Sequence, residues 1–68
     1  MDNNDIYRML TSDNIISIEE TPQTIIGNYK QFIYSTTFEK LNKHKIKYFV
    51  AITDHEELRL VIGKNQIS

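Results

Sequence analysis

The apolar residues of the chain are densest near its end, in residues 46–53 (IKYFVAIT) and 58–62 (LRLVI). Both runs are rich in β-branched and aromatic residues, and the polar loop DHEE separates them, which predicts a β-hairpin. Pairing Ile52 with Leu58 would gather six apolar side chains on one face, and a shift by one residue would scatter them. These six are Tyr48, Val50, Ile52, Leu58, Leu60 and Ile62. We expect helical segments to cover this face.

The same pairing places Phe49 and Val61 together on the opposite face of the hairpin. An apolar stripe there requires either a second covering layer or a partner molecule. The N-terminal residues Ile6, Met9 and Leu10 could provide the layer within the chain. Both alternatives remain open at the level of sequence.

Three further elements have local signals. Residues 5–10 have apolar side chains at helical spacing after an acidic start, which predicts a short helix. Residues 15–20 (IISIEE) alternate as a half-buried strand does, and we expect this strand beside the hairpin. Residues 36–39 (TTFE) have the form of a capping box, which predicts a helix that runs to about His44.

The segment from Thr21 to Tyr34 is ambiguous. Thr21 followed by Pro22 resembles a helix start, and the apolar residues that follow recur at helical spacing, at Ile25, Ile26, Tyr29, Phe32 and Ile33. The β-branched and aromatic content favours strands instead, with Gly27-Asn28 as a hairpin turn. We prefer the helix.

This order of elements predicts an α+β fold in one domain, residues 1–68, with a small antiparallel sheet. We expect about three strands, including the C-terminal β-hairpin, packed by one or two helices. If residues 25–34 form a strand, the class is unchanged.

Composition narrows the classes of function. The 68 residues have a net charge of −1 and no cysteine, so disulfides and thiolate metal sites are excluded. No apolar run has membrane-spanning length and the start is acidic, so we expect a soluble, cytoplasmic protein with no membrane contact. Frequent Ile, Asn and Lys are typical of an AT-rich genome. Our hypothesis is that a phage or another mobile element of an AT-rich bacterium encodes the protein.

Catalytic signatures are lacking in the sequence. His44 and His55 have no partner at metal-ligand spacing, and no nucleotide-binding or hydrolase motif occurs. The loop Asp54 to Glu57 could bind a cation or act in acid/base chemistry, but hairpin loops are generally polar. We expect no enzyme, no cofactor and no metal site.

Two functions fit the remaining features. Residues 1–27 have five acidic side chains and one basic, whereas residues 28–48 have five basic and one acidic. The first interpretation is a protein-binding regulator, inhibitor or accessory subunit that occludes a surface of its partner, either a foreign protein or a second copy. Its site would combine apolar anchors with lysines that steer an acidic partner, at Phe49, Val61, Tyr48, Lys43, Lys45 and Lys47.

The alternative is a nucleic-acid-binding protein that uses the basic segment from Lys40 to Lys47. Tyr48 or Phe49 would then stack on bases while the lysines contact phosphates. The slightly acidic net charge argues against it, because nucleic-acid-binding domains are generally basic.

Overall fold

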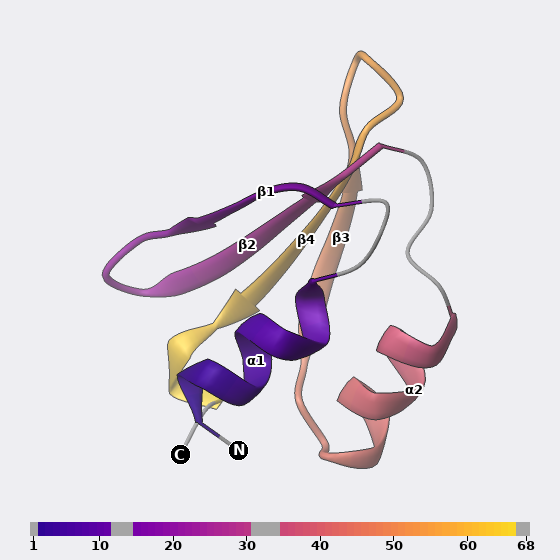
Figure 1. The fold of residues 1–68 in the computed structure, drawn as a ribbon. Coiled ribbons are helices and arrows are strands. Elements are labelled where there is room, and N and C mark those ends of the chain that lie inside the picture. The colour runs from indigo at the N-terminus through magenta and orange to yellow at the C-terminus, as the bar shows by residue number, and fades with distance from the viewer. Residues whose placement is uncertain (1, 12–14, 31–34, 67–68) are drawn as a thin grey trace.

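The computed structural model describes residues 2–11, 15–30 and 35–66. Along the chain the elements are α1 (Asn3–Leu10), β1 (Ile15–Glu20), β2 (Thr24–Tyr29), α2 (Ser35–Lys43), β3 (Tyr48–Ile52), β4 (Leu58–Gly63) and the 3₁₀ turn η1 (Lys64–Gln66). The strands form one antiparallel sheet in the order β1-β2-β4-β3. Both helices lie against the same face of it (Figure 1). The α+β fold expected from the sequence is confirmed, with four strands in place of about three.

The C-terminal hairpin has the predicted register, with Ile52 opposite Leu58 and Val50 opposite Leu60. The helices cover only part of the apolar face of the hairpin, which corrects the expectation that they cover all of it. Leu60 and Ile62 are fully buried, but the hairpin extends beyond both helices (Figure 1). Val50 is therefore 44% exposed and Ile52 74% exposed.

The preferred helix in residues 21–34 is wrong, because Thr24–Tyr29 is β2, one of the two inner strands of the sheet. The Thr21 hydroxyl accepts hydrogen bonds from the backbone N–H groups of Gln23 (3.2 Å) and Thr24 (2.9 Å). An N-cap makes the same kind of bond, but here it closes the turn between β1 and β2, with Pro22 in the turn.

The alternative that placed strands in this segment is correct only in part. Gly27 and Asn28 lie within β2 and do not form a hairpin turn. Phe32, Ile33 and Tyr34 lie outside the described residues. Strand β2 bears Ile25 and Tyr29 on the helical face and Ile26 on the opposite face, which obscures the alternation expected of a strand with one buried face.

The other predicted elements exist, with small differences. Helix α1 begins at Asn3, where the Asp2 and Asp5 carboxylates accept hydrogen bonds from each other's backbone N–H groups, at 2.9 and 3.2 Å. The bond from the Asp5 N–H, in particular, lowers the pKa of Asp2. Helix α2 already contains Thr36, so it starts earlier than the predicted cap. Strand β1 pairs with β2 and not with the hairpin.

Tyr29 joins the helical layer to the sheet. Its side chain is fully buried, and its hydroxyl donates a 2.5 Å hydrogen bond to the backbone carbonyl of Leu10. Leu10 ends α1, so this carbonyl has no partner within the helix. The ring lies over Gly27, where a Cβ would come within 2.9 Å of Tyr29 Cε2. Glycine at position 27 therefore allows Tyr29 to reach α1.

Replacing Tyr29 with Phe should lower the free energy of unfolding by about 1–3 kcal/mol, because the buried Leu10 carbonyl loses its only described donor. Burial also raises the pKa of Tyr29 to about 12. The unfolded phenol ionises near its usual value of 10, so the contribution of neutral Tyr29 is complete below that pH. It is lost as the pH rises toward 12. Urea denaturation at pH 7 and at several values between 10 and 12 measures both effects.

The half-buried Tyr48 offers a matched control, Tyr48→Phe, which should cost less at pH 7 and leave the alkaline decline in place. An alkaline decline of equal size in Tyr29→Phe and wild type would contradict the role assigned to the Tyr29 phenol.

Candidate protein-binding site

The face of the sheet that points away from the helices has an apolar row across three strands. Phe49 pairs with Val61, which pairs with Ile26. Paired residues share a face. Val61 and Ile26 are half-buried, whereas Phe49 is 79% exposed. We call this side the open face.

The N-terminal helix does not cover the open face. Ile6 and Leu10 are fully buried in the core beneath the other face, and Met9 packs against that core. The interpretation in which these residues shield Phe49 and Val61 is therefore wrong. Within the described part of the chain, Phe49 has no covering layer.

Next to the apolar row lies a row of hydrogen-bonded polar side chains. Asn28 is only 7% exposed, and its amide nitrogen donates to Ser17 Oγ (3.1 Å) and Glu19 Oε2 (2.7 Å). Its amide oxygen accepts from Arg59 Nε at 3.1 Å. These polar groups satisfy one another's hydrogen bonds. The apolar row is therefore the part of the open face whose exposure to water is unfavourable.

A hollow of about 740 Å³ lies at the root of the hairpin, beside Phe49. It brings together five of the six residues expected at a binding site, namely Lys45, Lys47, Tyr48, Phe49 and Val61. The sixth, Lys43, lines a separate hollow between α1 and α2, together with Asp5 and His44. The structure thus groups the predicted residues around the start of β3 and leaves Lys43 apart.

Tyr48 differs from its neighbours in orientation. Its pairing with Ile62 places it on the helical side of the sheet, where its ring is tilted by 34° against Phe38 at a centroid distance of 5.3 Å. Tyr48 is half-buried, so it forms part of the wall of the hollow while Phe49 projects from the open face.

Lys45 is fixed by the way α2 ends. The Ile46 N–H donates to the Leu41 carbonyl (2.9 Å) and the Lys45 N–H to the Asn42 carbonyl (3.0 Å), the pair of bonds of a Schellman motif. Ile46 and Leu41 are buried, as that motif favours. Lys45 has φ 58°, a left-handed conformation that glycine adopts more easily. A lysine is thus held, at a conformational cost, at the edge of the hollow.

The hollow has a positive charge and no negative one. Two lysines line it, and none of its ten lining residues is acidic. Among the described residues, an ion pair forms between Lys64 Nζ and Glu20 Oε1 at 3.3 Å, on the β1 and β2 side of the sheet. Within the residues that the structure describes, no carboxylate forms an ion pair with Lys45 or Lys47, so their positive charge can act on a bound molecule.

Sequence reasoning missed the far wall of the hollow, which consists of Gly63, Asn65 and Gln66. The turn η1 carries the last two, and Gln66 Oε1 accepts a 3.4 Å hydrogen bond from the Lys47 N–H. Nothing in the local sequence signals this approach. The Leu41 to Ile46 spacing could have indicated the helix end, but a lysine in the usual glycine position hides it.

The other candidate groups stay separate. His44 follows α2, and His55 lies in the hairpin loop. In residues 2–11, 15–30 and 35–66, no three His, Asp or Glu side chains come together as metal ligands would. No helix in the same ranges is long and apolar enough to cross a membrane.

Comparison with protein-family models, curated proteins and solved structures finds no match to this chain.

Replacing Lys45 with Gly should raise the free energy of unfolding by about 1 kcal/mol, since glycine relieves the left-handed strain. Glu56 in the hairpin loop has φ 61°, and Glu56→Gly should stabilise the protein in the same way. Urea denaturation of both variants measures the effect. Destabilisation by both substitutions would contradict the backbone geometry described here.

Proposed function

We propose that the protein acts by binding another protein and occluding part of its surface, as a regulator, inhibitor or accessory subunit. The observation that supports this most is the 79% exposure of Phe49 beside a hollow whose charged lining residues are all basic. An aromatic ring left in water on a sheet gains about 1.5–3 kcal/mol when it is buried. Phe49 is therefore the expected anchor.

The geometry favours a particular kind of partner surface. Lys45 and Lys47 border the hollow next to Phe49 and Val61. A segment with an apolar side chain flanked by carboxylates would bury the ring and also neutralise the lysines. Tyr48 contributes wall area, and Lys43 lies too far around α2 to share the hollow. The lysines would mainly speed association, while the apolar contact would set the lifetime of the complex.

A selection from a random peptide library displayed on phage tests this proposal without knowledge of the partner. Selected sequences should combine an aromatic or aliphatic residue with neighbouring Asp or Glu. Their affinity should fall by about tenfold or more in Phe49→Ala and by a few-fold in Lys45→Gly. Because Lys45→Gly is expected to stabilise the fold, a loss of binding there cannot be attributed to unfolding.

Two matched controls separate the site from general effects. Ile16→Ala removes an exposed apolar side chain from β1, away from the hollow, and Glu56→Gly relieves strain in the hairpin loop. Both should bind the selected peptides as wild type does. The proposal fails if no acidic and apolar sequence is enriched, or if Phe49→Ala binds the selected peptides unchanged.

A second candidate function is nucleic-acid binding, favoured by the placement of Lys45, Lys47 and Phe49 around one hollow. A ring next to cations could stack on a base while the lysines contact phosphates. Fluorescence anisotropy with a single-stranded oligonucleotide tests it. The logarithm of the binding constant should fall with the logarithm of salt concentration by about 0.7 for each phosphate neutralised. No binding at low salt would exclude this candidate.

A further inference from the structure

Strand β3 forms one edge of the sheet, and its outward backbone groups can be identified. The Thr53 N–H donates to the Glu57 carbonyl at 2.8 Å, which marks that pair as hydrogen-bonded. Bonded and non-bonded pairs alternate along an antiparallel ladder. Counting back along the register, Ala51 and Phe49 bond to β4. The N–H and C=O groups of Tyr48, Val50 and Ile52 therefore point off the edge.

Residues 48–52 of this edge have none of the charges, prolines or bulges that usually prevent strands from pairing with other molecules. The opposite edge, β1, has a bulge between Ile15 and Ser17 and ends in two glutamates. Strand β3 reads YFVAI, with no charge and no proline, and its register with β4 is unbroken. Its exposed apolar side chains lie on both faces, since Phe49 belongs to the open face and Val50 and Ile52 to the helical side.

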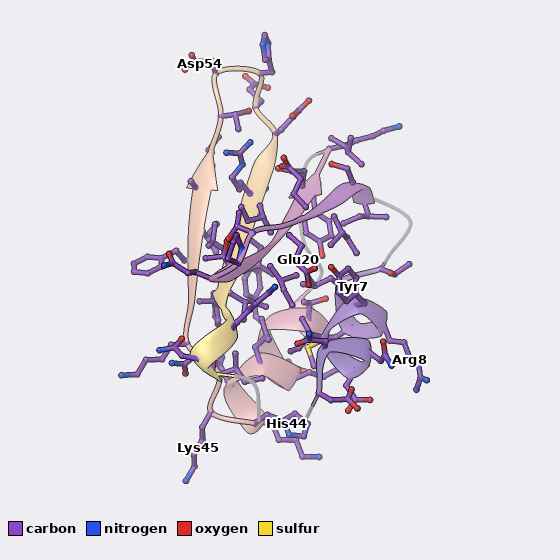
Figure 2. All side chains as sticks on the ribbon, turned by 90° about the vertical axis from the view of Figure 1, so that its left-hand side faces the viewer. Tyr7, Arg8, Glu20, His44, Lys45 and Asp54 are labelled. Carbon is purple, nitrogen blue, oxygen red and sulfur yellow. The ribbon has the colours of Figure 1, made fainter. Side chains whose placement is uncertain are left out.

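The distribution of charge along the hairpin indicates which molecule would pair with this edge. The root of the hairpin has Lys45 and Lys47, and its tip has Asp54, Glu56 and Glu57. Figure 2 shows Lys45 and Asp54 at opposite ends of the hairpin. Antiparallel pairing of two copies would place each basic root against the other's acidic tip, whereas parallel pairing would place like charges together.

We propose that two copies of the chain pair through β3, antiparallel, about a twofold axis at Val50, so that their sheets join. In this register Val50 lies opposite Val50 of the second copy, and Tyr48 lies opposite its Ile52. All outward N–H and C=O groups of β3 then find partners. Phe49 comes opposite the small Ala51, and Lys47 comes opposite Thr53, next to Asp54 of the second copy.

The inference goes beyond the proposed function and does not depend on it. Pairing uses the backbone edge of β3, whereas the hollow is also lined by β4 and η1. The two ideas can fail separately. Peptide binding should persist in a variant that cannot pair, and pairing can occur without any peptide ligand.

Size-exclusion chromatography with light scattering, from micromolar to millimolar chain concentration, tests the pairing. Wild type should rise from 8.0 kDa toward twice that mass. Val50→Pro removes an N–H that points off the edge, so it breaks no bond to β4, and it should stay at the monomer mass. The matched control Val50→Thr keeps the N–H and the β-branched shape and should still dimerise.

A charge reversal tests the same register without proline. Lys47→Glu alone and Asp54→Lys alone should each weaken dimerisation several-fold, because like charges then meet at both ends. The double variant Lys47→Glu/Asp54→Lys should restore it. Both side chains are exposed, so the folded monomer should tolerate these changes.

Three results would overturn the proposal. Wild type could remain at 8.0 kDa at every concentration. A folded Val50→Pro could dimerise as wild type does, which would place the interface elsewhere. The double variant could also dimerise no better than either single reversal, which would exclude the antiparallel register.

Discussion

The contact of Tyr29 with α1 across Gly27 is the constraint on which the rest of the structure depends. In so short a chain the two helices can cover only one face of the sheet, and the Tyr29 hydroxyl binds α1 to that face at the Leu10 carbonyl. The helical layer is therefore gathered over the centre of the sheet, on β2 and the root of the hairpin (Figure 1). The open face and the outer half of β3 therefore remain in water.

The sequence predicted the hairpin well because its information is local and periodic. A shift of the register by one residue would separate Leu60 and Ile62 from Tyr48, and the chain adopts a register that keeps the three on one side. Strand β2 could not be predicted in the same way. The Thr21 hydroxyl makes bonds that suit either a helix start or a turn, and only pairing with strands on both sides decides between them. Tertiary contacts override a local signal here.

The candidate site was predictable to the same extent as the register. Phe49 and Val61 lie together on the open face because alternation along a strand requires it. The hollow beside them depends on the turn after β4, which brings Gln66 to the Lys47 backbone. The left-handed backbone conformation of Lys45 could not be predicted from the sequence either, because a Schellman motif is normally recognised by a glycine at this position. The helices do not extend over the outer part of the hairpin, which leaves Ile52 exposed. This depends on how the whole fold packs and has no signal in the sequence.

Amide hydrogen exchange along β3, followed by NMR at low and high chain concentration, tests the central claim that this strand is bonded on one side and open on the other. At low concentration the N–H groups of Phe49 and Ala51 should be protected and that of Val50 should exchange rapidly. Protection of Val50 should then grow with concentration as copies pair. Slow exchange of Val50 at every dilution would contradict the account, because it would mean that the edge is already covered within one chain.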